Sequence, residues 1–401
     1  MDTDVYFHKT VSFRAWKQRL QFRTSQELFS SHDIDTGTRF LLRSIVEADY
    51  QPRRILDLGC GYGPIGLTLK KLHPDSAAYM VDRDALAVAY THQNAELNGL
   101  EDVEIYGSLG YDDVERNDFD LMISNIPGKA GEAVITYLLR EARYYLAPGG
   151  LAAIVIVAAL EKTVTKILEK TPGLEIVLRR NRSGHAIFHY RFTGETASPE
   201  PEQSSIARGV YHRQDIDMRL DGIVYRMETA HGLPEFDSLS YGSEMLIKAL
   251  KDLQGRDIQH VVNFNPGQGH VAVMLWKLIK PENIVLVDRD LLALRYSQRN
   301  LVLNGCPAGK ISLNHQVGLK STGKDKIDLF IGVLRESEGR DAIFLTIKQA
   351  VDSLSPDGTM IVSGGSTAIT RLVDDLESEG LADIITRERR RGYSLLISGG
   401  V

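Results

Sequence analysis

The sequence has few cysteines, no excess of basic residues and no long apolar run. Its two cysteines, Cys60 and Cys306, cannot form a disulfide framework and fit a reducing compartment. The formal net charge of −6 excludes a uniformly basic nucleic-acid coat, although a local basic face remains possible. The longest apolar run, residues 151–160, is about half the roughly 20 residues of a transmembrane helix, and the first ten residues lack the apolar core of a signal peptide. We therefore expect a cytoplasmic protein without a membrane segment.

A repeat spans nearly the whole chain. The segment VDRDALAVAYTHQNAELNG (81–99) aligns without a gap with VDRDLLALRYSQRNLVLNG (287–305), which lies 206 residues further on. Other pairs match at offsets of 205 to 208, among them ILDLGCGYG (55–63) with VVNFNPGQG (261–269) and LAPGG (146–150) with LSPDG (354–358). Because the offset drifts so little, the pattern indicates duplication of a whole domain.

The repeat predicts the domain organisation. We expect a first domain at residues 1–193, a linker at 194–205 and a second domain at 206–401, since the segment around the linker is rich in Pro, Ser, Thr and Glu. Each copy alternates apolar strand segments with helical ones, which predicts an α/β fold with a doubly wound, mostly parallel sheet. In the first copy we expect strands at 54–58, 77–81, 103–106, 119–124 and 151–157, and helices at 64–72, up to about 97, and 132–146. Ligands should lie at the carboxyl ends of these strands.

A glycine-rich turn follows the first expected strand. Gly61 to Gly66 satisfies G-x-G-x-x-G and Asp82 ends the next strand, so a nicotinamide dinucleotide is one candidate ligand. Glycines let the backbone approach a ligand, and a carboxylate at the strand end can accept both hydroxyls of a ribose. Asp57 favours S-adenosylmethionine instead, because an acid two residues before Gly59 would repel a pyrophosphate and attract an ammonium group. A tight turn without a ligand is the alternative.

A second polar segment, SNIPGKAG at residues 124–131, follows the fourth strand. The amide oxygen of Asn125 and the backbone carbonyl fixed by Pro127 offer two acceptors to the hydrogens of an exocyclic amine. They would hold the nitrogen lone pair toward an electrophilic methyl. Methyl transfer from a sulfonium is an in-line displacement that requires alignment and an exit for the proton, so no strong base is needed. The alternative is a plain turn in which Asn125 caps the next helix.

These motifs together resemble the class I S-adenosylmethionine-dependent methyltransferases of the "methyltransferase small" group. The segments that carry the resemblance are FRT (22–24), LFS (28–30), IDTGT (34–38), LDLGCGYGPIGL (56–67), VDRDALAVA (81–89), NAELNG (94–99) and SNIPGKAG (124–131). The layout is similar to that of the tandem-domain ribosomal RNA guanine-N2 methyltransferases, in which one of two related halves is degenerate. The resemblance implies methyl transfer from S-adenosyl-L-methionine to an exocyclic amine of an RNA base.

The resemblance also implies roles for individual residues. The cofactor-binding residues would be Asp57, Gly59, Cys60, Gly61 and Gly63 around the methionine part, Asp82 and Arg83 at the ribose, and Ser108 and Leu109 beside the adenine. The catalytic residues Asn125 and Pro127 would hold the target nitrogen, with Asn125 also bordering the cofactor. The substrate-binding residues would be Thr38, Ile126, Gly128 and Lys129.

The chain departs from the family in two places. Ile126 replaces the first proline of the family's Asn-Pro-Pro, and Gly128 replaces the aromatic residue that would stack on a flipped base. A protein or small-molecule amine therefore remains an alternative acceptor, as does a noncatalytic role in RNA binding or ribosome assembly. In the second copy, the positions of Asp57, Gly59 and Asn125–Pro127 hold Asn263, Asn265 and Val333–Arg335. We therefore expect an active first half and a degenerate second half, whereas in the tandem enzymes the carboxy-terminal half is active.

Basic stretches favour RNA as the partner. Residues 5–26 contain five Lys or Arg residues and no acid, interleaved with aromatics, and residues 179–192 and 387–391 each contain four arginines. Cations neutralise phosphates and aromatics stack on unpaired bases, although each stretch alone also fits a solvated edge. Four histidines of the first half, His8, His92, His185 and His189, do not have the spacing of metal ligands, so no metal is expected. The oligomeric state stays open.

Overall fold

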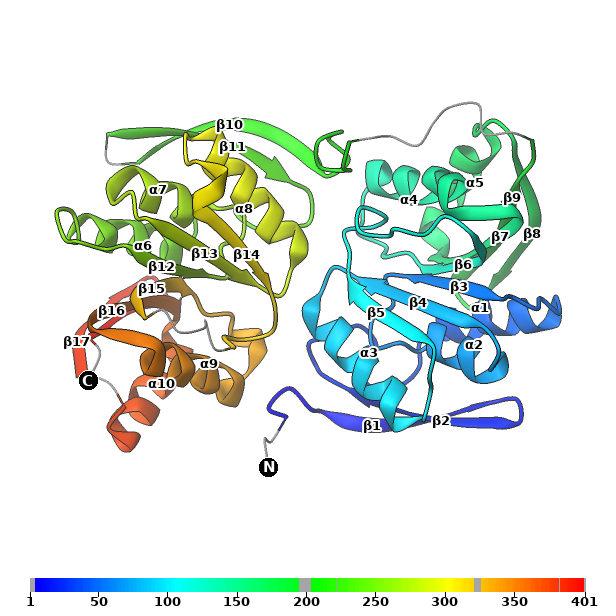
Figure 1. The fold of residues 1–401 in the computed structure, drawn as a ribbon, viewed down its shortest axis with the longest axis horizontal. Coiled ribbons are helices and arrows are strands. Elements are labelled where there is room, and N and C mark those ends of the chain that lie inside the picture. The colour runs from blue at the N-terminus through cyan, green and yellow to red at the C-terminus, as the bar shows by residue number, and fades with distance from the viewer. Residues whose placement is uncertain (1–3, 195–202, 221, 321–325, 382, 400–401) are drawn as a thin grey trace. The chain divides into compact units, whose positions relative to one another are not determined.

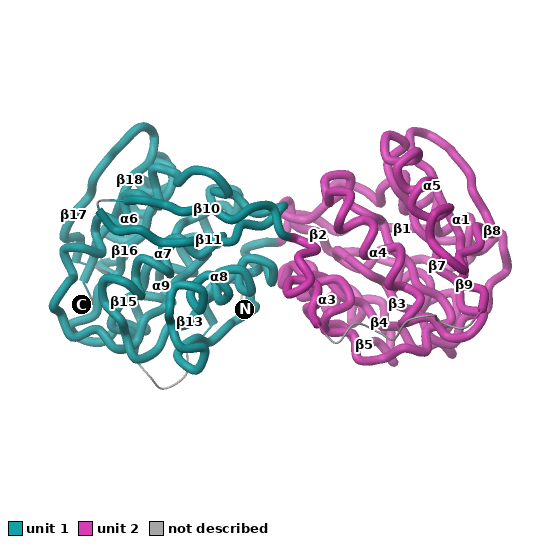
Figure 2. Tube along the Cα trace, turned by 90° about the horizontal axis from the view of Figure 1, so that it is seen from above, with its two compact units in different colours: residues 1–6, 212–401 teal, residues 7–211 magenta. Residues whose placement is uncertain are grey.

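The computed structural model describes residues 4–194, 203–220, 222–320, 326–381 and 383–399. The chain divides into two compact units, shown in Figure 2. The N-terminal unit comprises Phe7–Tyr211, and the C-terminal unit comprises Met1–Tyr6 with His212–Val401. Most of the expected linker lies outside the described residues. Residues 206–211, expected to begin the second domain, belong to the N-terminal unit instead, where the Tyr211 ring lies 6.4 Å from that of Tyr137.

The N-terminal unit is built on a seven-stranded sheet with the order β5-β4-β3-β6-β7-β9-β8 (Figure 1). Its strands are β3 (Arg54–Leu58), β4 (Ala77–Asp82), β5 (Val103–Gly107), β6 (Phe119–Asn125), β7 (Leu146–Val157), β8 (Leu174–Arg182) and β9 (His185–Phe192). Its helices are α1 (Thr36–Glu47), α2 (Gly66–Leu72), α3 (Ala85–Leu97), α4 (Glu132–Tyr145), η1 (Ala158–Leu160) and α5 (Glu161–Glu169). Strands β3 to β7 pair in parallel, and β9 runs antiparallel to β7 and β8. A separate hairpin consists of β1 (Lys9–Ala15) and β2 (Gln18–Thr24).

The C-terminal unit repeats this arrangement with the strand order β14-β13-β12-β15-β16-β18-β17. Its strands are β10 (His212–Leu220), β11 (Ile223–Ala230), β12 (His260–Phe264), β13 (Asn283–Asp288), β14 (Ile311–His315), β15 (Ile327–Val333), β16 (Leu354–Gly365), β17 (Asp383–Arg390) and β18 (Tyr393–Gly399). Its helices are α6 (Tyr241–Lys251), α7 (His270–Leu278), α8 (Leu291–Leu303), η2 (Ala308–Lys310), η3 (Glu336–Glu338), α9 (Arg340–Ser353) and α10 (Ser366–Glu379). The shared strand order confirms the predicted pair of doubly wound sheets.

Local sequence accounts for most of these elements. Residues 151–156 of strand β7 form an apolar run that is buried on both faces, as expected for a strand with helices on either side, whereas Val157 at the strand end is exposed. Helix α3 begins after the cap residue Asp84, whose side chain accepts from Leu86 N, and it ends at Asn98 before Gly99, which has a φ of 61°. Helix α2 begins at Gly66, two residues later than expected, because residues 64 and 65 still belong to the turn.

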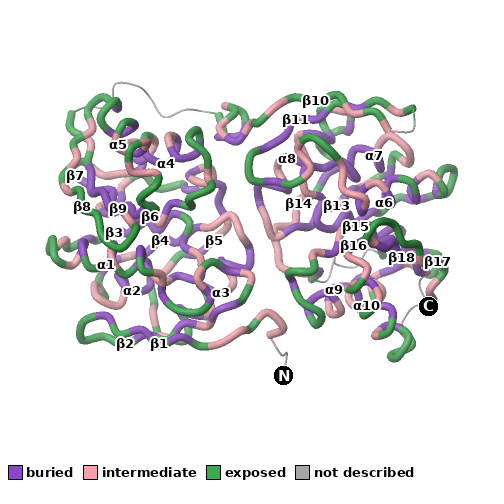
Figure 3. Tube along the Cα trace, turned by 180° about the vertical axis from the view of Figure 1, so that it is seen from behind, coloured by how far each residue is buried: buried purple, intermediate pink, exposed green. Residues whose placement is uncertain are grey.

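Alternation along β3 directs its side chains to opposite faces of the sheet. Leu56 and Leu58 belong to the apolar core that α4 and α5 cover, together with Ile135 and Leu168. Figure 3 shows buried residues concentrated along the strands of each sheet. Because neighbouring residues of a strand point to opposite sides, Asp57 faces away from this core, toward the start of α2.

No helix in the described part of the chain is both long enough and apolar enough to cross a lipid bilayer.

Candidate active site

The carboxyl ends of three neighbouring strands bring the predicted site residues of the N-terminal unit together. Strand β3 pairs in parallel with both β4 and β6, so the glycine turn, Asp82 and Asn125 lie at one edge of the sheet. The turn is tied to β4, because Gly59 N and Cys60 N donate to Val81 O at 2.8 and 3.0 Å. This edge is where open α/β sheets bind their ligands.

Asp82 holds the glycine turn in shape. Its Oδ2 accepts from Gly61 N at 2.9 Å, and its Oδ1 accepts from Asp84 N at the same distance. Gly61 has a φ of +60°, and a Cβ built there would meet no atom within 4 Å. The turn therefore presents bare backbone to open space, which is a cradle that a ligand could enter.

The Asp57 carboxylate is completely buried behind this cradle. Its Oδ2 accepts from Gly66 N at 2.7 Å, at the start of α2, whereas its Oδ1 finds no hydrogen-bond partner among the described residues. Burial raises the pKa of Asp57 to about 7, the Gly66 N–H lowers it, and the charge of Asp82 raises it again. An unpartnered buried carboxylate oxygen suits a nearby cationic ligand group, which would interact with it through a bridging water or through its charge.

Two other residues of the turn have structural functions. Cys60 is buried, with its Sγ 3.6 Å from Thr91 Oγ1, and burial together with the charges of Asp82 and Asp57 raises its pKa. A thiol in this state is not a nucleophile. Gly63 is required by packing, because a Cβ there would lie 2.6 Å from Leu67 Cδ1.

The loop after β5 lies beside Asp82. Ser108 N donates to Asp82 O at 2.9 Å, and Arg83 follows Asp82 with a partly exposed side chain. The side chains of Ser108 and Leu109 are buried, and the Ser108 hydroxyl donates to Gly110 O at 2.8 Å. Contact of this loop with a ligand would therefore come from its backbone rather than from these two side chains.

Asn125, at the end of β6, is held through its amide nitrogen. Nδ2 donates to Asp35 Oδ2 and to Thr38 Oγ1, at 3.2 Å in each case. No described residue donates to its Oδ1. The amide oxygen is therefore the group that Asn125 can offer to a ligand.

The other residues that were predicted to contact the methyl-accepting substrate fall into two groups. Pro127, Gly128 and Lys129 are exposed, in a turn closed by the bond from Ala130 N to Pro127 O. Thr38 and Ile126 are buried instead, so their side chains are not exposed to a methyl-accepting substrate. Ile126 continues the inward alternation of β6 into the core.

Three residues in this region, Asp35, His185 and Val157, were not predicted as site residues from the sequence. A Cβ built on Gly37 would lie 2.8 Å from both Asp35 Oδ2 and His185 Cδ2, which places the His185 ring beside Asp35. A Cβ on Gly128 would lie 3.3 Å from Val157 Cγ2, and Val157 is 40% exposed. Asp35 lies within the IDTGT segment, which was a usable signal, whereas nothing in the sequence marks His185 or Val157.

Comparison with known proteins identifies the family. The "Methyltransferase small domain" family model matches residues 19–184 and again residues 225–374. The chain belongs to this family. It is 35% identical over 149 residues to the uncharacterized protein YbxB of Bacillus subtilis (strain 168), covering 37% of this chain and 74% of that protein. The predicted family and the methyltransferase class are thereby confirmed.

Two further relatives have more informative names. The chain is 37% identical over 140 residues to ribosomal RNA small subunit methyltransferase C of Hahella chejuensis, covering 34% of this chain and 40% of that protein. The match thus spans less than half the length of that relative. A solved Thermus thermophilus structure, the 16S rRNA N2 G1207 methyltransferase in complex with AdoMet and guanosine, matches at a TM-score of 0.67 and 17% identity over 99% of both chains. At this identity the likeness establishes the tandem fold.

In the C-terminal unit, side chains of the chain itself form hydrogen bonds at the positions that correspond to the predicted site. Arg335, at the position of Pro127, donates to Asp288 Oδ1 and Oδ2 at 3.0 and 2.7 Å, and Asp288 is at the position of Asp82. Asn265, at the position of Gly59, donates to Val333 O at 2.9 Å. A guanidinium of the chain itself thus pairs with the carboxylate that corresponds to the predicted ribose acceptor.

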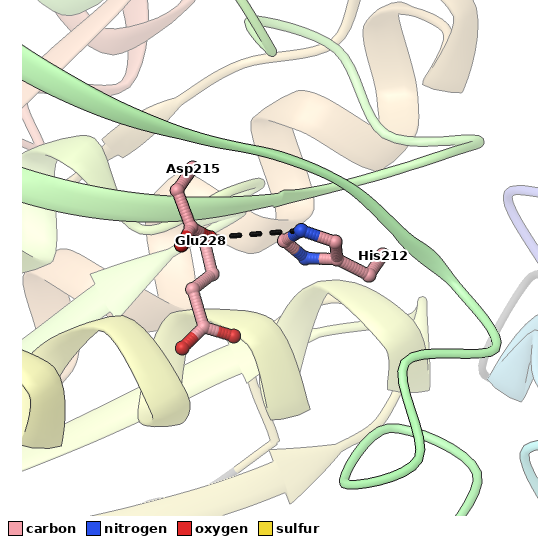
Figure 4. Close-up of side chains that lie close together, drawn as sticks. All are labelled: His212, Asp215 and Glu228. Carbon is pink, nitrogen blue, oxygen red and sulfur yellow. Dashed lines mark ion pairs between the residues drawn. The ribbon is translucent and has the colours of Figure 1, made fainter.

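The hairpin of β10 and β11 carries three side chains of metal-ligating type, His212, Asp215 and Glu228, which Figure 4 shows. His212 Nε2 lies 3.6 Å from Asp215, whose carboxylate also pairs with Arg226 at 2.9 Å. Glu228 pairs with Arg299. Because guanidinium groups already neutralise both carboxylates, we assign no metal here, and the expected absence of a metal cofactor stays a prediction.

Proposed function

We propose that the N-terminal unit binds S-adenosyl-L-methionine and methylates an exocyclic amine of a ribosomal RNA base, with guanine N2 as the acceptor. The observation that carries the proposal is Asn125, whose amide oxygen is left to accept at the same sheet edge as the glycine cradle and Asp82. The names of the relatives support the acceptor, since they include ribosomal RNA small subunit methyltransferase C and large subunit methyltransferase G.

The residues around the cradle fit this cofactor. The unpartnered Oδ1 of Asp57 would attract an ammonium group, and Asp82 would accept from ribose hydroxyls. The bare backbone at Gly61 leaves space for the ligand to lie against the turn. When bound, S-adenosylmethionine supplies the methyl group as an electrophile on sulfur.

Asn125 and the Ile126 carbonyl would align the acceptor. Each oxygen accepts one N–H of the exocyclic amine, which leaves the nitrogen lone pair directed at the methyl carbon. The nitrogen–carbon bond forms as the carbon–sulfur bond breaks, and the amine then loses one proton to solvent. The proposed step requires no residue to act as a strong base.

Several residues that the sequence suggested as RNA contacts are buried or already paired in the structure. Phe13 and Phe22, expected among the stacking aromatics, are buried in the unit and cannot stack on a base. Arg179, Arg180 and Arg191 are paired with Glu161, Glu47 and Glu175.

A hollow between α1 and the end of β8 remains as the favoured RNA contact. It has a volume of about 320 Å³, and its lining includes Phe40, Arg43 and Arg182. Neither Arg43 nor Arg182 forms an ion pair with a described residue. A cytoplasmic location is part of this proposal, because the acceptor RNA would be met there.

The deciding experiment measures transfer of a labelled methyl group from S-adenosylmethionine into total RNA and, in parallel, into total protein. The proposal expects label in ribosomal RNA and its loss in an Asn125→Ala variant that still binds the cofactor. Label in protein alone, or transfer that persists in Asn125→Ala, would overturn it.

A further inference from the structure

The orientation of the Asn125 amide is dictated by its neighbours at the start of α1. Asp35 Oδ2 accepts from Asn125 Nδ2 at 3.2 Å, and Thr38 Oγ1 lies at the same distance. A carboxylate can accept but not donate, so the amide nitrogen rather than the oxygen must face Asp35. An amide with no such neighbour could reverse by rotation about its last side-chain bond.

The reversed orientation would defeat the proposed reaction. It would present the amide NH₂ to the acceptor nitrogen and donate into the lone pair that has to attack the methyl group. Fixing the amide is therefore part of the alignment that the reaction requires.

Helix capping alone does not explain a carboxylate at position 35. Asp35 Oδ2 caps α1 by accepting from Thr38 N at 3.1 Å. In the C-terminal unit, Ser240 caps α6 in the same way, accepting from Ser243 N at 3.1 Å, and the residue at the Asn125 position is Val333. A serine thus suffices for the cap where no amide has to be oriented.

We propose that Asp35 is a positioning residue that fixes the side-chain amide of Asn125 with its oxygen toward the acceptor amine. One atom, Asp35 Oδ2, accepts from both Thr38 N and Asn125 Nδ2. The positioning role therefore requires a side-chain oxygen that can accept hydrogen bonds at position 35. The inference rests on the proposed function for the identity of the acceptor, and on the two hydrogen bonds for the orientation.

Two substitutions separate positioning from capping. Asp35→Ser keeps the cap, as Ser240 does, but its hydroxyl is too short to hold Asn125. Asp35→Asn keeps an amide oxygen that can accept both bonds. We expect kcat for methyl transfer to fall at least tenfold in Asp35→Ser with little change in the cofactor Kd, and Asp35→Asn to restore most of it. The matched control is Ser240→Ala, which weakens a cap in the other unit without lowering kcat.

A kcat of Asp35→Ser equal to that of the wild type would overturn the inference, and so would an Asp35→Asn variant as slow as Asp35→Ser. A second readout does not need an acceptor: the side-chain amide NMR signals of Asn125 should shift in Asp35→Ser and stay near their wild-type position in Asp35→Asn. Unchanged signals in Asp35→Ser would also overturn it. If the wild type itself transfers no methyl to RNA, the proposed function fails, and the NMR comparison still decides the orientation.

Discussion

Arg335 forms a two-point ion pair with Asp288, a carboxylate that is completely buried in the C-terminal unit. The two residues occupy the positions of Pro127 and Asp82 in the N-terminal unit, which are predicted parts of its acceptor and cofactor sites. The C-terminal unit therefore differs from the N-terminal unit by more than the loss of groups that could bind ligands. It also has Arg335, whose guanidinium pairs with Asp288, the acid that is retained at this position.

Removal of Arg335 should destabilise the C-terminal unit. Arg335→Ala leaves the Asp288 charge buried without this partner, which costs about 3 kcal/mol of unfolding free energy. Urea unfolding can follow this unit alone through Trp276 on α7 in a Trp16→Phe background, because Trp16 and Trp276 are the two tryptophans of the chain. The control Arg340→Ala breaks the exposed pair with Asp375 and should change little. Equal stabilities of the two variants would contradict the prediction, whereas Asp288→Asn added to Arg335→Ala should recover part of the loss.

His189 should make the N-terminal unit sensitive to acid. Ser44 Oγ donates to Leu41 O, so it accepts from His189 Nε2 at 2.8 Å, and the buried Nδ1 has no partner among the described residues. Burial, with the charge of Arg180 adding to it, lowers the pKa of His189 to about 4. The unfolded chain binds a proton near pH 6.5. The stability contribution is therefore present above pH 6.5 and is lost as the pH falls toward 4, by about 3 kcal/mol in total.

The measurement is urea unfolding of the N-terminal unit at pH 7, 5 and 4, followed through Trp16 in a Trp276→Phe background. A His189→Gln variant should lack the histidine part of the pH dependence. An identical pH dependence in the variant and the parent would show that His189 is not the buried group responsible.

The sequence predicts the local parts of this protein well. Strand and helix alternation, the Asn98–Gly99 helix end and the glycine turn each depend on residues close together in the chain, so their patterns are visible without the fold. The contact of Asn125 with Asp35 joins residues 90 positions apart, and only folding brings α1 to the end of β6. The repeat alignment likewise identifies Arg335 as a substitution but does not reveal that its side chain reaches Asp288.

Binding of S-adenosylmethionine should strengthen as the pH rises from 6 to about 7.5. Burial, which has the largest effect, and the charge of Asp82 raise the pKa of Asp57 to about 7. The carboxylate that would attract the ammonium group therefore ionises across this pH range. Higher pH adds the loss of the ligand's own proton, since an α-amino group titrates near 8. Calorimetry with Asp57→Asn should show weaker binding with a flatter pH profile, and Asn263 at the corresponding position shows that an asparagine fits the fold there.

The free protein should respond to pH in the opposite sense. The folded pKa of Asp57 lies above its value in the unfolded chain, so the stability contribution is present below the unfolded pKa and is lost as the pH rises through about 7. Asp57→Asn should therefore be more stable than the wild type at pH 8, with a smaller difference at pH 6.

The binding measurement has its own contradicting outcome. An Asp57→Asn variant that binds the cofactor as the wild type does at every pH would exclude Asp57 from the site.

Gly61→Ala should weaken cofactor binding more than it weakens the fold. The φ of +60° makes an alanine strained by about 1 kcal/mol, and its methyl group would project into the open cradle. Gly99→Ala is a matched control, because Gly99 has a φ of +61°, nothing lies within 4 Å of a Cβ built on it, and it follows the C-cap of α3. Both variants should lose similar stability, and only Gly61→Ala should raise the Kd for S-adenosylmethionine by tenfold or more. Equal Kd values in the two variants would show that the cradle is not the cofactor site.

Arg43 and Arg182 should contribute to RNA affinity without affecting cofactor binding. Both line the hollow between α1 and β8, and neither forms an ion pair with a described residue, since the carboxylate in the same lining, Glu47, pairs with Arg180. Each phosphate contact that is lost reduces the dependence of log Kd on log salt concentration by about 0.7 to 0.9. The double variant Arg43→Ala with Arg182→Ala should therefore bind ribosomal RNA more weakly and with a shallower salt dependence, as measured by filter binding across a salt series. Arg191→Ala, which removes an arginine already paired with Glu175 at 2.8 Å, should leave the slope unchanged. If all these variants reduce the slope equally, the hollow has no special part in RNA binding, and a nonspecific basic surface explains the affinity.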